Sequence, residues 1–122
     1  MGTINGDQLR GHLDNMILAT LERGEIHGLG ILQRLEEAGC GLLKLKEGSL
    51  YPALYRLEGA GLVSSKSVPV PTGQKGATRR VYSLTRKGKK ALADGRTQWN
   101  EFVSVIGGIL GATPCLKLSP AN

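Results

Sequence analysis

Residues 47–63 read EGSLYPALYRLEGAGLV and residues 77–85 read ATRRVYSLT, and these two stretches decide the fold. The first predicts a short amphipathic helix capped by Gly61, because its Leu and Ala residues recur on one helical face. Strand-like sequence follows over 62–68 and returns over 79–84, on either side of a loop rich in Pro and Gly. This is the layout of a winged helix, in which the helix enters a DNA major groove and a basic hairpin reaches the flanking backbone.

Two further helices are expected before this block, over residues 7–23 and 27–39, where apolar residues recur at helical spacing. Residues 42–46 alternate apolar and polar side chains and predict a very short strand. Pro52 lacks an N–H group and is tolerated in the first turn of a helix. The third helix is therefore expected to start close to Ser49 or to bend there.

A last long helix is expected after Thr85, which is suited to cap it. Its apolar seam repeats about every 3.5 residues, as in helices that pair with another helix. One winged helix cannot cover the whole seam, so we expect a homodimer whose interface contains Leu92, Trp99, Phe102, Ile106 and Ile109. The predicted fold is α+β, mostly α: a winged helix-turn-helix domain over 1–85, a dimerisation helix over 86–111 and a disordered tail over 112–122.

The charge of the chain is concentrated in one region. The formal net charge is +6, and no acidic residue lies between Glu58 and Asp94. That interval holds eight of the 16 Lys and Arg residues. A local positive field of this kind favours a polyanionic partner and is typical of a surface that faces phosphates, although a hairpin whose charges are simply solvated would look the same.

Other classes of protein find little support in the sequence. Cys40 and Cys115 lie far apart and show neither a disulfide framework nor a C-x-x-C motif, and pairing one of them with His27 gives no metal-ligand spacing. The sequence has no nucleophile elbow, no dinucleotide-binding glycine motif and no phosphate-binding loop. We therefore expect a cytoplasmic protein without membrane segment, metal, cofactor or enzymatic activity.

Candidate DNA contacts lie on the polar face of the third helix and on the hairpin. Ser49 is a hydroxyl at a helix start, and exposed tyrosines suit phosphates, sugars or thymine methyl groups. In the hairpin, Arg79 and Arg80 alternate sides, so one is expected to face DNA and the other solvent or an acidic neighbour. The full set of expected DNA-binding residues is Lys46, Ser49, Tyr51, Pro52, Tyr55, Arg56, Lys75, Arg79 and Arg80.

One residue of this set and three residues outside it have alternative roles. Tyr51 could instead lie partly in the core with its hydroxyl group outward. His27 stands at a helix start, where a histidine serves more often as a cap or phosphate contact than as a metal ligand. Gly28 and Gly30 are poor helix formers, and we expect them to allow two helices to approach closely.

Several phrases of the sequence resemble those of the PadR family of bacterial transcriptional regulators. They are Ile26-His27-Gly28, Gly48 to Leu54 (GSLYPAL), Arg56-Leu57-Glu58, Gly61-Leu62, and Val81 to Thr85 (VYSLT) with Gly88. The resemblance runs from about Leu9 to Leu110 and is closest to a short subgroup often associated with permease-like genes, which carries a Trp where Trp99 stands. Many members have an aromatic residue at the position of Leu29, and a shorter hairpin loop.

The resemblance implies a homodimer that binds double-stranded DNA, most often a repressor acting on an inverted-repeat operator. Some members respond to small apolar or aromatic effectors, and a slot beside Trp99, at the centre of the dimerising helix, is the candidate site for one here. A plain packed Trp in a dimer core is the alternative. For the whole chain, the alternative is a winged-helix module that binds another protein through the same tyrosine face.

Overall fold

The computed structural model describes residues 12–43, 45–70 and 76–111. Along the chain these residues form α2 (Leu13–Leu21), β1 (Ile26–His27), α3 (Gly28–Ala38), α4 (Glu47–Gly59), β2 (Val63–Pro69), β3 (Thr78–Leu84) and α5 (Arg86–Leu110). The mostly helical fold with a small sheet, a winged helix followed by a long C-terminal helix, is confirmed. None of the helices in these ranges is long and apolar enough to span a membrane.

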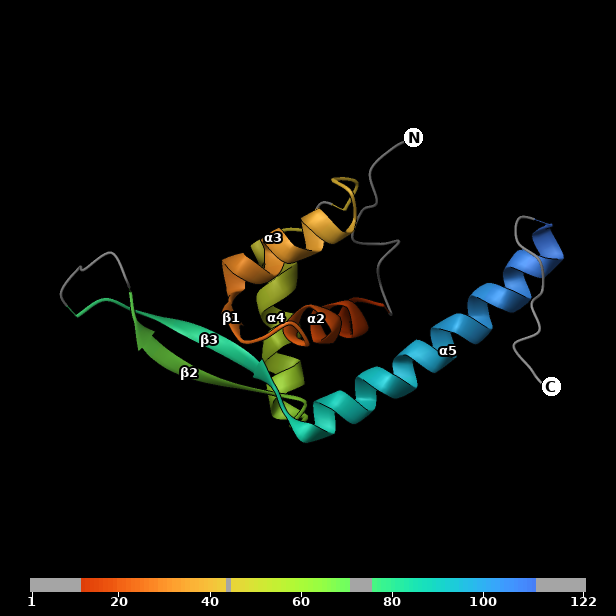
Figure 1. The fold of residues 1–122 in the computed structure, drawn as a ribbon. Coiled ribbons are helices and arrows are strands. Elements are labelled where there is room, and N and C mark those ends of the chain that lie inside the picture. The colour runs from red at the N-terminus through yellow and green to blue at the C-terminus, as the bar shows by residue number, and fades with distance from the viewer. Residues whose placement is uncertain (1–11, 44, 71–75, 112–122) are drawn as a thin grey trace.

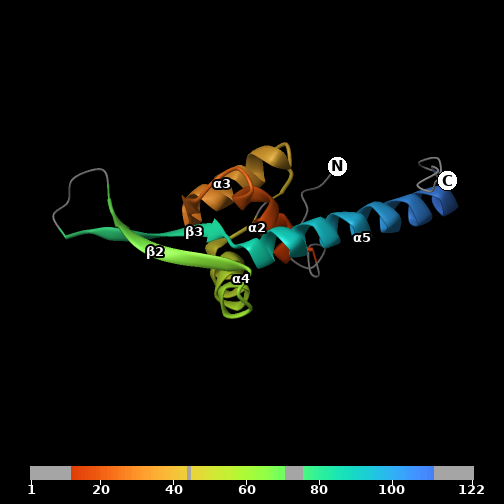
Figure 2. The same cartoon turned by 60° about the horizontal axis from the view of Figure 1, so that its bottom comes forward.

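The molecule has a helical body with two projections. In Figures 1 and 2, α2, α3 and α4 pack together, the β2–β3 hairpin extends to one side, and α5 extends to the other. The sheet is antiparallel with the strand order β1-β3-β2. Tyr82 in the central strand pairs with Ile26 on one side and with Ser65 on the other, so the short β1 joins the start of α3 to the hairpin.

An aliphatic core holds the three helices, the base of the hairpin and the start of α5 together. Its largest fully buried side chains are Ile17, Leu18, Ile31, Leu50, Leu54, Leu57 and Val63. Leu92 of α5 belongs to the same cluster and is only 2% exposed. The prediction that Leu92 contributes to a dimer interface is therefore wrong, because its side chain packs against its own winged helix and is not available to a second protomer.

Within the described residues the predicted helices and hairpin strands are confirmed, and residues 7–11 of the first predicted helix lie outside them. The short strand β1 was not predicted, and two other expectations differ from the structure. Residues 42–46 do not form a strand: Leu43 makes an isolated bridge and packs into the core, Lys44 lies outside the described residues, and the others are irregular. α4 begins at Glu47, so Pro52 lies in its second turn. The carbonyl group that Pro52 leaves without an N–H partner is that of Gly48, which is exposed and open to water.

The ends of the helices explain why glycine and threonine stand where they do. Gly61 has φ +79°, its N–H donates to Glu58 and the N–H of Leu62 donates to Leu57, which is a Schellman motif and confirms the expected cap of α4. At the start of α5, the side chain of Thr85 accepts a hydrogen bond from Gly88 N at 3.0 Å, as expected of an N-cap.

Candidate nucleic-acid interface

The outward face of α4 carries the tyrosines and the polar residues that the sequence singled out. Leu50, Leu54 and Leu57 turn into the core, because they recur every three or four residues. The opposite face exposes Ser49, Pro52 and Arg56 and leaves Tyr55 83% exposed. A tyrosine this exposed on a rigid helix gains little from its own chain, so its ring and hydroxyl group are available to a partner.

Tyr51 is held differently from Tyr55, although both lie on α4. Its ring reaches across to the start of α3, where a side chain at Gly28 would collide with the tyrosine hydroxyl group. The hydroxyl is therefore directed at α3 and not outward, while the side chain stays 40% exposed. The expected close approach at Gly28 is confirmed, whereas Gly30 makes room for Ile26 of β1 and for the His27 ring.

Two of the expected DNA-binding arginines have partners in the protein. Arg56 forms an ion pair with Asp14, with 2.6 Å between Nη2 and Oδ1, and so ties α4 to α2. Arg80 donates to the Ser65 hydroxyl at 2.9 Å, and that hydroxyl donates to a carboxylate oxygen of Glu58 at 2.7 Å. These contacts are exposed, so each stabilises the fold only weakly. The Arg80–Ser65–Glu58 chain links the hairpin to α4.

Arg79 lies on the other face of the hairpin, as the alternation of a strand requires. It makes no ion pair with any residue that the structure describes, and its Nε is buried without a hydrogen-bond partner. The arginine expected to have an acidic neighbour is thus Arg80, which reaches Glu58 through Ser65, and Arg79 is the one left unpaired. Lys75 lies outside the described residues, and Lys46 is exposed at the N-cap of α4.

His27, which is not among the expected DNA-binding residues, stands beside Arg79. It is the N-cap of α3, but its side chain makes no capping bond, and the first turn of α3 has no acidic residue. The pKa of His27 lies below its ordinary value, first because partial burial disfavours the charged ring and second because Arg79 repels it. One signal in the sequence is a histidine directly before a glycine-rich helix start, but the proximity of His27 to Arg79 depends on the pairing of β1 with β3.

The outer half of α5 carries a second group of exposed residues, two of them aromatic. Trp99 is 47% exposed, its ring stacks on Phe102 with 5.8 Å between centroids, and His12 meets it edge-on at 5.2 Å. A hollow of about 210 Å³ lies beside these rings, between α2 and α5. Further along, Val103, Val105, Ile106, Ile109 and Leu110 are exposed as well.

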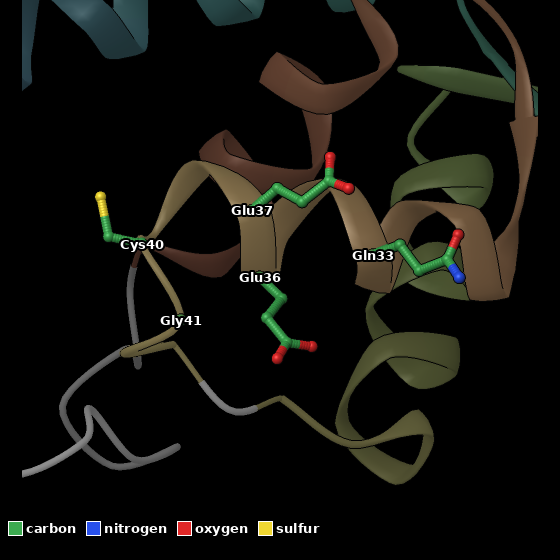
Figure 3. A pocket seen from close by; sticks show the side chains of 5 residues that line it. All are labelled: Gln33, Glu36, Glu37, Cys40 and Gly41. Carbon is green, nitrogen blue, oxygen red and sulfur yellow. The ribbon is translucent and has the colours of Figure 1, made fainter.

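A larger hollow of about 600 Å³ lies at the end of α3 but has no convergent chemistry. It is lined by Gln33, Glu36, Glu37, Cys40 and Gly41, and Figure 3 shows the two carboxylates and the thiol pointing in different directions. Within the described ranges, no three His, Cys, Asp or Glu side chains come together as a metal site would need. The candidate functional surfaces are therefore on α4, the hairpin and α5.

Comparison with known proteins agrees with this arrangement. The model of the Transcriptional regulator PadR-like family matches residues 17–94, more than half of the chain. The chain belongs to the PadR-like family of transcriptional regulators. The transcriptional regulator Rv3488 of Mycobacterium tuberculosis is a relative by sequence: it is 38% identical over 85 residues, which cover 69% of this chain and 73% of that protein.

Solved structures show the same fold. A transcriptional regulator from Clostridium thermocellum has a TM-score of 0.74 and 29% identity and covers 84% of this chain and 96% of its own. A PadR family regulator from Clostridium difficile has a TM-score of 0.71 and 31% identity over 83% of this chain and all of its own. PadR-like proteins are transcriptional regulators and not enzymes, so the expectation drawn from the missing catalytic motifs is confirmed by the family.

Proposed function

We propose that this PadR-like regulator binds double-stranded DNA sequence-specifically as a homodimer and acts as a repressor on an inverted-repeat operator. The observation that carries the proposal is the outward face of α4, where Tyr55 is 83% exposed. Beside it lies a hairpin whose Arg79 has no ion-pair partner among the described residues. A rigid helix of this kind can enter a major groove, and the hairpin can reach the flanking phosphates. The exposed residues of α4 would then read the bases.

The outer half of α5 supports the homodimer. This half projects beyond the helical body (Figure 1) and exposes Trp99, Phe102, Val103, Val105, Ile106, Ile109 and Leu110. A contiguous apolar stripe on a projecting helix is stabilised by a second copy of the same helix. A two-fold pair would present two α4 helices to DNA in opposite directions, so its operator would be an inverted repeat. A repressor is the simplest regulator of this design, since occupancy of the operator blocks other proteins from it.

The direct test is a gel shift with operator DNA selected from genomic fragments, repeated over a range of salt. Tyr55→Ala should weaken binding to the selected site by about 1–3 kcal/mol while leaving random DNA nearly unaffected. Lys75→Ala should weaken both about equally and flatten the log–log salt slope by about one unit. Lys90→Ala is the matched control, because Lys90 already pairs with Asp94 on α5, at 3.5 Å.

Two outcomes would contradict the proposal. Equal losses on specific and random DNA for Tyr55→Ala would show that the outward face of α4 does not read bases. No binding to any fragment at low salt would favour the alternative, a winged-helix module that binds a protein through the same face. The repressor role is tested separately, with a reporter gene behind the selected operator: expression should rise when the regulator is deleted.

A further inference from the structure

His27 lies where the elements that would approach DNA meet. It ends β1 and caps α3, and the next residue, Gly28, is covered by Tyr51 from the second turn of α4. On its other side, β1 pairs with β3 of the hairpin, with His27 opposite Val81. Figures 1 and 2 both place the start of α3 on the hairpin side of the molecule. A duplex that touches both α4 and the hairpin therefore passes His27.

The charged groups around His27 follow from the register of the sheet. Val81 is paired with His27 in β1 and with Lys66 in β2, and Arg79 stands two residues before Val81. Paired residues and residues two apart point to the same face of a sheet, so His27, Arg79 and Lys66 share one face. Lys66 is paired with Glu25 at 3.5 Å, whereas Arg79 has no carboxylate partner in the described part of the chain. The local excess of positive charge is therefore centred on Arg79.

The start of α3 adds to the positive field around His27. The first turn of α3 contains no acidic residue, and no side chain caps it, so the partial positive charge of the helix start is not compensated there. From α4 the neighbouring side chain is Tyr51, which is uncharged. Arg79 thus opposes a proton on His27, and the partial positive charge at the start of α3 acts in the same direction. Lys66 lies on the same face but is paired with Glu25.

We propose that His27 and Arg79 hold one backbone phosphate of bound DNA between them, and that His27 takes up a proton as the DNA binds. The proposal rests on the proposed DNA-binding function and names a contact and a regulatory input at the same site. In the free protein the neutral ring is favoured by partial burial and by Arg79. A phosphate between the two side chains supplies the missing negative charge, offsets the repulsion by Arg79 and favours the protonated ring, which can then donate a hydrogen bond to it.

Operator affinity should consequently depend on pH in a defined direction. Well above the pKa of His27 in the complex, both states are neutral and affinity is constant. As the pH falls between the pKa of the complex and the lower pKa of the free protein, binding takes up protons and affinity rises. The gain is about tenfold per half-site for each pKa unit by which the phosphate raises His27.

The two histidines of the chain allow a matched experiment. We would measure the affinity of the full chain for its selected operator duplex by fluorescence anisotropy, at constant ionic strength, from about pH 5.5 to about pH 8.0, where histidine titrates. The wild type should bind more tightly at low pH. His27→Gln should remove this dependence and keep the weaker affinity of the neutral ring, whereas His12→Gln should keep the dependence. The slopes are compared, so a change in overall affinity in either variant does not disturb the test.

Two further measurements locate the proton and the phosphate. The NMR titration of the His27 ring should show a higher pKa in the complex than in the free protein. Neutral methylphosphonate linkages, placed one at a time along the operator, should abolish the pH dependence at one position per half-site. A flat wild-type profile, or a slope retained in His27→Gln, would overturn this inference while DNA binding itself stands. Absence of DNA binding at every pH would instead overturn the proposed function.

Discussion

Arg96 of α5 holds Glu22, just after α2, with two hydrogen bonds: Nη2 lies 2.8 Å from Oε1, and Nη1 lies 3.0 Å from Oε2. Paired bonds of this kind fix direction as well as distance. The neighbouring Gly95 lets α5 approach α2 so closely that any side chain there would collide with Asn15. The angle at which α5 leaves the body is therefore set by this crossing, and in a dimer it would also set the spacing of the two α4 helices.

The Glu22–Arg96 pair makes stability depend on pH at the acid end. The pKa of Glu22 is lowered, mainly by its hydrogen bond to Arg96 and less by their charge attraction. Its contribution to stability is then present above the ordinary pKa of a glutamate and is lost as the pH falls through the lowered value. Arg96→Gln should lower the melting temperature at neutral pH and make no difference well below that pKa. Lys90→Gln, which breaks an exposed ion pair within α5, is the control. An equal loss at both pH values would contradict this.

Gly88 lies at the junction between the hairpin and α5, where the packing leaves no room for a side chain. Its N–H donates to the Thr85 side chain, which itself donates to the carbonyl oxygen of Gly61 at 2.7 Å. A methyl group at Gly88 would collide with the carbonyl group of Leu62, and backbone cannot move aside as a flexible side chain can. Gly88→Ala should therefore destabilise the protein by about 1–3 kcal/mol in chemical denaturation.

The matched control for this substitution is Gly59→Ala in α4, because nothing lies within 4 Å of the added methyl group there. Alanine favours a helix over glycine by about 0.5–1 kcal/mol, so this variant should be neutral or slightly more stable. A similar loss for both variants would show that the Leu62 carbonyl contact is not the cause.

The helices and the hairpin could be predicted from sequence because each has both a periodic pattern and a residue that ends it. Leu92 could not be placed, because an apolar seam on a helix does not reveal which part packs inward and which part awaits a partner. The seam turned out to be divided: Leu92 is buried, whereas Ile109 is 75% exposed. The strand predicted over residues 42–46 was wrong for a related reason. Leu43 is apolar because it packs into the core, and not because it alternates with polar residues in a sheet.

For the candidate interface, the sequence identified residues but not their partners. Exposed Tyr55 was foreseen from its place on the polar face of α4. That Arg56 reaches Asp14, 42 positions away, depends on how α4 crosses α2 and could not be read from spacing. His27 was not among the expected DNA-binding residues for the same reason: its neighbour Arg79 is brought there by strand pairing.

Cys40 occupies a backbone conformation that suits glycine. Its φ is +58°, and it stands in the Schellman motif that ends α3, with the N–H of Gly41 bonded to Glu36 and its own to Glu37. A side chain in this left-handed region costs about 1 kcal/mol or more. Cys40→Gly should therefore raise stability by up to about 1 kcal/mol, less the extra freedom of glycine in the unfolded chain. Gly61→Ala, at φ +79° after α4, should lower it; a loss in both variants would contradict the argument.

The dimer proposal predicts a change in mass when charge enters the apolar stripe of α5. Phe102→Glu combined with Ile106→Glu should give a monomer in light scattering, because four carboxylates would then meet in one interface. Asn100→Glu should stay a dimer, since by helical periodicity Asn100 lies on the far side of the helix from Phe102. Helix content by circular dichroism checks that the double variant remains folded. A dimer mass for the folded double variant would place the interface elsewhere.

Trp99 is the candidate site for a small aromatic effector. In one protomer its ring is half-exposed, stacked on Phe102 and flanked by His12. In a dimer through α5, two such aromatic groups near the axis would bound an apolar slot able to stack a flat aromatic compound. Such a ligand should quench Trp99 fluorescence at micromolar concentration and weaken operator binding with the same midpoint, because one binding event causes both. A cyclohexyl analogue of equal size is the control, as it cannot stack. Quenching without any change in operator affinity would leave Trp99 a structural residue of the dimer core.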